Sequence, residues 1–123
     1  MATQAPGFTR GCPLDGLLRL LGAQWTPHLL WVLSHEGPTR FGALRRRLDG
    51  ISSKVLTERL RSLEAEGIVY RDHVPTIPPQ VTYGLTAKGR ELADVLGGLD
   101  HVAARWHLPE TARAREQAAR TAS

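Results

Sequence analysis

Residues 39–74, TRFGALRRRLDGISSKVLTERLRSLEAEGIVYRDHV, decide the fold. Apolar spacing predicts a helix over 41–48, Asp49-Gly50 predicts a tight turn, and a longer helix is expected over 51–66. The core stripes of the two helices are Phe41, Leu44 and Leu48, followed by Leu56, Leu60 and Leu63. After Gly67 the apolar period changes from helical to alternating, which indicates a strand over 68–74. Two helices joined by a tight turn and followed at once by a strand are typical of a helix-turn-helix with an attached hairpin.

The flanking sequence completes a winged helix-turn-helix. A helix is expected over 13–22, and another from Thr26, its predicted N-cap, to about residue 36. Residues 39–40 are short enough to be only an extended link. The proline-rich segment 75–79 cannot continue a strand, so 68–74 and 80–85 are expected to form a hairpin with a stiff tip. A long helix follows from about residue 87, and the fold class is therefore mainly α with a small antiparallel β-hairpin.

Length and composition indicate one globular domain. The 123 residues are 41% hydrophobic and 23% charged, values close to the globular average. We expect a flexible arm over 1–11, a DNA-binding and dimerisation domain over 12–108, and an Ala/Arg-rich tail over 109–123. No segment approaches about 18 consecutive apolar residues, so no membrane span is expected. The beginning of the chain lacks the pattern of a signal peptide, and with a single cysteine this favours the cytoplasm.

The positive charge is concentrated in one segment. The formal net charge is +4, and residues 40–61 contain seven basic and two acidic residues, whereas the rest of the chain has nine basic and ten acidic residues. A solvated charged face would also explain such a cluster. Because the cluster coincides with the predicted helix pair, however, double-stranded DNA is the expected partner.

Helical geometry selects the side chains that reach DNA. When the leucine stripe of the second helix faces the core, Lys54, Thr57 and Glu58 lie on its opposite side. A major groove admits one helix, whose N-terminal residues reach base edges, so we expect Lys54 on guanine and Glu58 on cytosine. The predicted DNA-binding residues are Arg40, Arg45, Arg46, Ser52, Ser53, Lys54, Thr57, Glu58, Arg61, Arg71 and Gln80.

Several of these residues have an alternative, purely structural interpretation. Ser52 and Ser53 would serve equally well as caps of the second helix. Glu58 would pair with Arg59 or Arg61 inside that helix. Arg45, Arg46 and Arg47 cannot all face the same way, so one of them is expected only to cover the domain surface.

The long C-terminal helix predicts self-association. Its apolar face is larger than one small domain would cover, so a partner copy is expected to pack on this helix and the first helix. The predicted interface residues are Leu14, Leu17, Leu18, Leu92, Val95, Leu96, Leu99, Val102 and Trp106. A close helix crossing or a kink would explain Gly97-Gly98 inside the helix. Two-fold symmetry would place the two recognition helices about 34 Å apart and predicts a palindromic operator.

Several linked segments between Cys12 and Trp106 carry a family resemblance. They are CP (12–13), GAQW (22–25), GPTRFGALRR (37–46), GISSKVLT (50–57) with RL (59–60) and LE (63–64), GIV (67–69), and PPQVTY (78–83) leading into LTAKG (85–89). In combination they resemble the HxlR family of winged-helix regulators, relatives of the MarR regulators. The resemblance implies a dimeric repressor or activator that responds to a small molecule or an oxidant. Gln24 departs from the family pattern, which usually has lysine there.

The resemblance also suggests where a signal could act. Cys12 occupies the position at which some family members carry a redox-sensing thiol, and the start of a helix favours the thiolate; an inert apolar residue is the alternative. A small-molecule effector would bind in the crevice between the first two helices and the long helix, lined by Trp25, Trp31 and Trp106. No metal site or cofactor is predicted from the histidine spacing. An enzyme using Cys12 as nucleophile lacks a recognisable partner base.

The sequence therefore predicts a DNA-binding transcriptional regulator and not an enzyme. The alternative function is a winged-helix module that binds another protein and has no operator. The cluster of arginines beside the second helix favours DNA.

Overall fold

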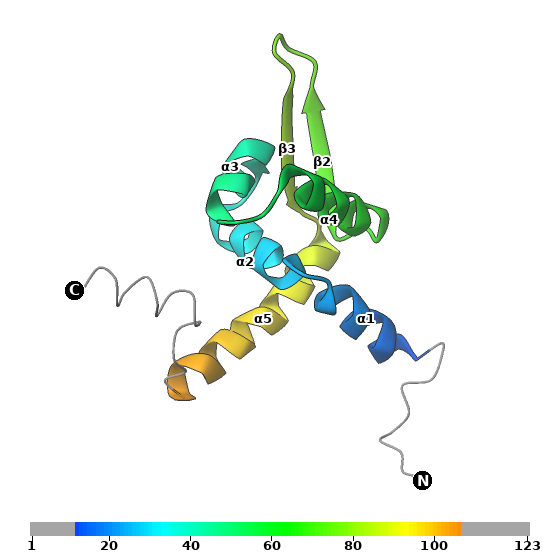
Figure 1. The fold of residues 1–123 in the computed structure, drawn as a ribbon. Coiled ribbons are helices and arrows are strands. Elements are labelled where there is room, and N and C mark those ends of the chain that lie inside the picture. Colours follow the sequence, from blue (N-terminus) through cyan, green and yellow to red (C-terminus); the bar gives the residue numbers. More distant parts are fainter. Residues whose placement is uncertain (1–11, 107–123) are drawn as a thin grey trace, which may run out of the picture.

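The computed structural model describes residues 12–106, and these form five helices and three strands (Figure 1). The predicted arm, the predicted tail and residues 107–108 of the predicted domain lie outside the described residues. The helices are α1 (Pro13–Gly22), α2 (Thr26–Glu36), α3 (Phe41–Arg47), α4 (Ser53–Ala65) and α5 (Ala87–Trp106). The strands are β1 (Thr39–Arg40), β2 (Val69–Val74) and β3 (Gln80–Leu85). The predicted fold class, mainly α with a small antiparallel hairpin, is confirmed.

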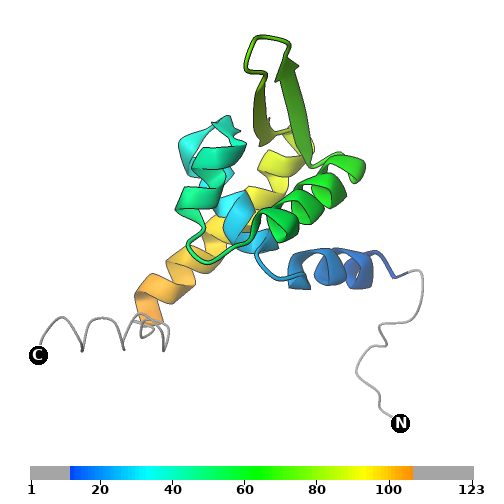
Figure 2. The same cartoon turned by 45° about the horizontal axis from the view of Figure 1, so that its top comes forward.

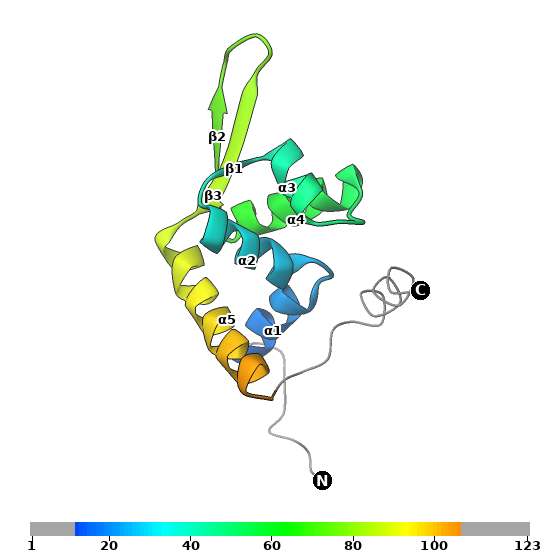
Figure 3. The same ribbon diagram turned by 90° about the vertical axis from the view of Figure 1, so that its left-hand side faces the viewer.

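The sheet has the order β1-β3-β2, with β3 in the centre. The hairpin of β2 and β3 is antiparallel and extends from the pair Val69–Leu85 at its base to Val74–Gln80 near its tip. The short β1 pairs with the other edge of β3, where Thr39 is opposite Tyr83. The hairpin projects well beyond the helices, as the two views in Figures 1 and 3 show.

The core lies where α2, α3, α4 and the N-terminal half of α5 meet the base of the hairpin. Its members are mainly leucines at the predicted inward positions, including Leu29, Leu30, Leu33, Leu44, Leu56, Leu60 and Leu63. Leu85 from β3 and Ile68 close the core at the hairpin base. Figure 2 shows α4 lying across the front of this core, with α1 below it. Because the predicted apolar stripes of α3 and α4 are buried, the opposite faces of these two helices are exposed to solvent.

Two helix starts differ from the sequence expectation. Thr26 was expected to cap α2, but it is the first residue of the helix and is buried, and the N-cap is Trp25, whose φ of 77° is left-handed. The expected cap is therefore wrong, because the aromatic side chain of Trp25 packs against the core and the turn forms around it. The start of α4 lies at Ser53 rather than at residue 51, since Ile51 is buried in the turn and Ser52 caps the helix.

Within the described residues, no helix is both long enough and apolar enough to cross a membrane.

Candidate nucleic-acid interface

The helix pair α3–α4 is a compact unit built around buried leucines. Leu44 and Leu48 of the first helix and Leu56 of the second are buried together. The turn between the helices is fixed by a main-chain hydrogen bond of 3.0 Å from Ile51 N to Leu48 O. Because both leucine stripes face inward, the basic residues between them are left on the outer surface.

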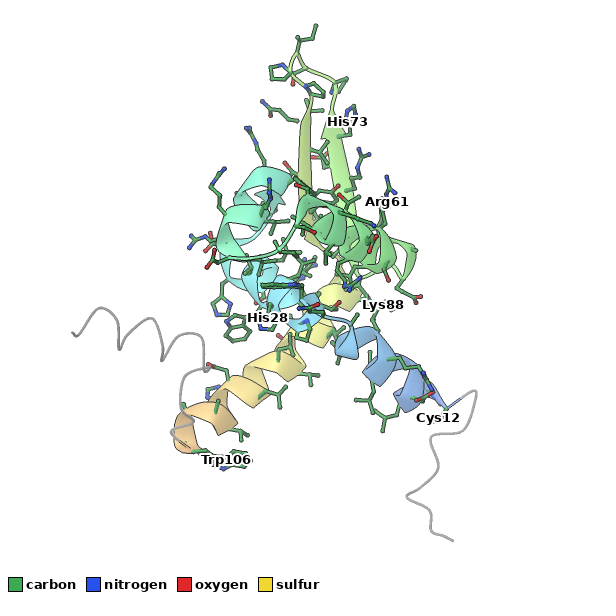
Figure 4. The ribbon with its side chains drawn as sticks, viewed as in Figure 1. Cys12, His28, Arg61, His73, Lys88 and Trp106 are labelled. Carbon is green, nitrogen blue, oxygen red and sulfur yellow. The ribbon has the colours of Figure 1, made fainter. Side chains whose placement is uncertain are left out.

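The outer face of α4 presents charged side chains to solvent. Lys54, Glu58 and Arg61 are exposed, and Thr57 is half-buried. The hydroxyl of Thr57 donates to Ser53 O at 2.8 Å, so its hydrogen is used inside the helix. Arg61 projects from α4 on the side of the molecule that carries the wing (Figure 4). Within residues 12–106, no side-chain hydrogen bond or ion pair involves Glu58, so the intrahelical pair with Arg59 or Arg61 is not formed.

The N-terminus of α4 is capped by one of the two predicted serines. The Ser52 hydroxyl accepts a hydrogen bond of 3.1 Å from Val55 N, and the Ser52 side chain is exposed. Ser53 is also exposed, but it belongs to the first turn of the helix. Capping is therefore observed for Ser52, and this bond uses one of the two lone pairs of the exposed hydroxyl.

The three arginines of α3 differ in their contacts. Arg47 forms an ion pair of 2.9 Å with Glu36 at the end of α2, which holds its side chain against the domain. Arg45 and Arg46 are exposed. This division agrees with the expectation that the three cannot act alike.

Two predicted DNA-binding residues meet between the helix pair and the wing. Arg40 Nη2 donates to Gln80 Oε1 at 3.0 Å, linking the strand before α3 to the strand that leaves the wing tip. On the neighbouring strand of the wing, Arg71 and His73 of β2 are both exposed, and Figure 4 labels His73. They are opposite Tyr83 and Val81 of β3 and, being two residues apart, lie on the same face of the hairpin. The wing thus has a basic face beside α4.

Sequence reasoning missed one residue of this region. Arg59 lies on α4, but its Nε donates to Gln24 O in the turn between α1 and α2 at 2.7 Å. The spacing in the sequence indicates this position, because Arg59 follows Leu56 by three residues and precedes Leu63 by four, which places it beside the leucine stripe. It therefore belongs to the edge of the buried stripe and not to the outer face.

A second surface, on α1 and α5, is apolar and exposed. It consists of Leu14, Leu17, Leu18, Val95, Leu99 and Trp106, with the partly buried Val102. Leu92 and Leu96 were expected to join it, but each is only 8% exposed and belongs to the core of the subunit. They are buried because the first half of α5 packs against α2, and their part in an interface stays a prediction. Cys12 and Trp106 mark this end of the molecule in Figure 4, away from Arg61 and His73.

Of the three tryptophans, Trp31 lines a groove between α2 and α5. This groove has a volume of about 290 Å³ and is also lined by His28, Leu99 and Asp100. Trp25 and Trp106 are not among the residues that line this groove. Trp25 instead contacts the ring of His28, and Trp106 is exposed. The predicted effector pocket therefore stays a prediction, and Trp31 is the tryptophan that lines this groove.

Cys12 is partly exposed at the N-cap position of α1. On the same helix, a hydrogen bond from Arg19 Nε to Asp15 Oδ2 of 2.9 Å raises the pKa of the Arg19 guanidinium above its ordinary value.

In the part of the chain that the structure describes, no group of three His, Cys, Asp or Glu side chains could hold a metal ion.

Comparisons with known proteins agree with this geometry. Residues 20–111 match the model of the family described as HxlR-like helix-turn-helix. An uncharacterized HTH-type transcriptional regulator of Synechocystis is 42% identical over 107 residues, covering 85% of this chain and 78% of its own. The reduced form of the transcriptional regulator YodB from B. subtilis superimposes with a TM-score of 0.68 at 36% identity, covering 81% of this chain and 98% of its own. The redox regulator HypR in its oxidized form gives a TM-score of 0.71 at 32% identity, covering 81% and 100%.

Proposed function

The chain belongs to the HxlR-like helix-turn-helix family of transcriptional regulators, and from this premise we propose that it binds a palindromic operator in double-stranded DNA as a homodimer. The observation that carries the proposal is the outer face of α4. It presents Lys54, Glu58 and Arg61 to solvent beside the exposed Arg45 and Arg46 of α3. A helix with such a face enters the major groove, while its neighbour contacts the backbone.

Each exposed group has a role that follows from its chemistry. Lys54, in the first turn of α4, would donate to guanine O6 and N7, and Glu58 one turn later would accept from cytosine N4. Arg45, Arg46 and Arg61 would neutralise phosphates, as would Arg71 from the wing. The hydrogen bond from Arg40 to Gln80 supports this arrangement because it holds the wing against the start of α3.

The homodimer is supported by the apolar surface on α1 and α5. Val95 and Leu99 are about 60% exposed on adjacent turns of α5, a position that is unfavourable in water unless another chain covers it. The surface lies at the end of the molecule away from α4 and the wing (Figure 4). Two copies joined there would leave both recognition helices free to face one duplex.

A signal to this regulator would act on the same end of the molecule. Cys12 begins α1, and it is the single cysteine of the chain. An oxidant such as hydrogen peroxide would take two electrons and two protons from a Cys12 pair, forming an intersubunit disulfide and two waters. An apolar aromatic effector would bind in the groove beside Trp31. In either case we expect a repressor whose DNA affinity changes with the signal.

A fluorescence titration of labelled duplexes at two or more salt concentrations tests the proposal. The duplexes are selected by the protein from fragments of its own genome. Because each neutralised phosphate adds about −0.9 to the slope of log affinity against log salt, a DNA-binding dimer will lose affinity steeply as salt rises. A winged helix that binds only another protein will show no duplex affinity at any salt concentration.

A further inference from the structure

The tip of the wing is apolar and fully exposed. Between β2 and β3 the chain reads PTIPP over 75–79, and the side chain of Ile77 is 101% exposed, the largest value among the exposed large hydrophobic residues. Val74, the last residue of β2, is 40% exposed just below it. An isoleucine that contacts nothing in its own subunit contributes nothing to the fold, so its apolar surface is available to a partner.

The tip has little capacity for polar contacts. Three of its five residues are prolines, which have no N–H group to donate to a phosphate. Thr76 N donates to Val74 O at 2.8 Å, and the Thr76 hydroxyl donates to Pro78 O at 2.8 Å, so both donors of Thr76 are used inside the turn. No charged residue occurs between 74 and 79. The tip is therefore unsuited to binding the sugar-phosphate backbone by charge or hydrogen bonds.

The rest of the wing nevertheless directs this tip toward DNA. Arg71 and His73 are exposed along β2, below the tip, and Arg40 ties β3 to the start of α3. The hairpin projects past α4 on the side opposite to the end of the molecule that holds Trp106 (Figures 1 and 4). A duplex held by α4 and the basic face of the wing would meet Ile77 beyond the last positive charge.

We propose that Ile77, braced by the surrounding prolines, is an apolar wedge that enters the minor groove beside the sequence read by α4 and partly unstacks one base step. The proposal rests on the DNA binding proposed above. Isoleucine and proline are among the side chains that proteins insert between base pairs to kink a duplex. The exposed apolar area of one side chain is too small for a stable protein partner, which needs several hundred Å² on each side, whereas one such side chain is enough to act as a wedge between base pairs.

The wedge would make binding depend on the sequence of a base step to which the protein makes no hydrogen bond. Pyrimidine–purine steps such as TA and CA unstack at the lowest cost, so they are expected at a fixed distance outside each half-site. Replacing the step with a stiffer one would weaken binding even though α4 reads the same bases.

The test compares the full-length wild type with Ile77→Ala and Ile77→Leu on one duplex that the wild type has selected from a random pool. A 2-aminopurine is placed at each flanking step in turn. We expect its fluorescence to rise at one step outside each half-site on binding of the wild type and of Ile77→Leu, but not of Ile77→Ala. We also expect Ile77→Ala to bind at least about tenfold more weakly, since three apolar carbons are lost from each wing. The salt slope will stay unchanged, because no charge is removed.

Each other result overturns the wedge in a recognisable way. Ile77→Ala binding as tightly as the wild type, with the same rise in fluorescence, removes Ile77 from the interface while leaving DNA binding intact. Weaker binding without any rise in fluorescence for the wild type shows a contact that does not unstack a base step. If the wild type binds no duplex, both the proposed function and the proposed wedge are contradicted. Because the side chain is fully exposed, all three proteins should melt at the same temperature.

Discussion

Arg59 Nε and the main-chain oxygen of Gln24 are 2.7 Å apart, and their hydrogen bond joins the recognition helix to the turn between α1 and α2. The turn is held in an unusual conformation, since Trp25 next to Gln24 has a φ of 77°. Non-glycine residues adopt this left-handed region only when their surroundings hold them there, and here Trp25 packs against the core. The orientation of α4 is thus linked to the start of the apolar α1–α5 surface.

Arg59→Gln should weaken the fold more than it weakens phosphate binding. Loss of the hydrogen bond to Gln24 O is expected to lower the free energy of unfolding by about 1–2 kcal/mol, as measured by urea denaturation. The slope of DNA affinity against salt should stay as in the wild type. The matched control is Arg61→Gln, which should change stability by less than about 0.5 kcal/mol and reduce the salt slope by about two phosphates per dimer, one for each subunit. A lower stability of Arg61→Gln together with a reduced salt slope of Arg59→Gln would contradict these roles.

Lys54→Ala and Arg46→Ala should affect DNA binding in different ways. Lys54 is expected to read a base, so its loss should cost about 1–3 kcal/mol on the selected duplex and relax the preference at one position. Arg46 is expected to contact phosphate, so its loss should weaken every duplex to a similar extent. Affinities for selected and random duplexes measure the difference. Equal effects of both substitutions on both duplexes would defeat the assignment of roles.

Ser52 allows capping and DNA contact to be separated. Aspartate caps helices as well as serine does, so Ser52→Asp should fold with wild-type stability, whereas its negative charge beside the phosphates should greatly reduce DNA affinity. Ser52→Ala removes the bond to Val55 N and should cost about 1 kcal/mol of stability. Thermal melting and duplex titration of both variants provide the measurement. Undiminished DNA binding by Ser52→Asp would place the start of α4 away from the backbone.

Two glycines of α5 should respond to alanine with opposite signs. A Cβ at Gly89 would clash with the main-chain oxygen of Ile68, so Gly89→Ala must displace α5 from the hairpin base and should cost several kcal/mol. A Cβ at Gly97 would meet no atom within 4 Å, and the better helix propensity of alanine should add up to about 1 kcal/mol. Urea unfolding at a concentration where the protein is monomeric tests both. If Gly97→Ala also weakens self-association, then a close helix crossing explains this glycine.

Much of the fold could be predicted because its boundaries are marked by local chemistry. Asp49-Gly50, Gly67 and the prolines of the wing tip interrupt the apolar periods at the points where the elements end. The leucine stripes of α3 and α4 are buried as their spacing requires. The outer face of α4 follows directly from those stripes, which is why sequence reasoning could name Lys54, Glu58 and Arg61 as exposed.

The remaining features depend on contacts between distant segments. The bond from Arg59 to Gln24 spans 35 residues, and that from Arg40 to Gln80 spans 40. Neither is encoded in a local period. The apolar stripe of α5 likewise does not say which of its residues are buried within the subunit, as Leu92 and Leu96 are. Three-dimensional packing alone divides that stripe into a buried first half and an exposed second half.

This division of α5 leads to a prediction about self-association. Leu99 is 60% exposed in the subunit, so Leu99→Asp should leave the monomer folded but place a charge in the proposed two-fold interface, where burial without a partner is unfavourable. The control is Ala104→Asp, which adds the same charge at an exposed position of α5 outside the apolar stripe. Sedimentation velocity should show a dimer for the wild type and Ala104→Asp and a monomer for Leu99→Asp. The monomer should lose most of its affinity for a palindromic duplex, because each copy then binds a half-site without the benefit of the other. A dimer that persists in Leu99→Asp would mean that α5 does not form the contact between subunits.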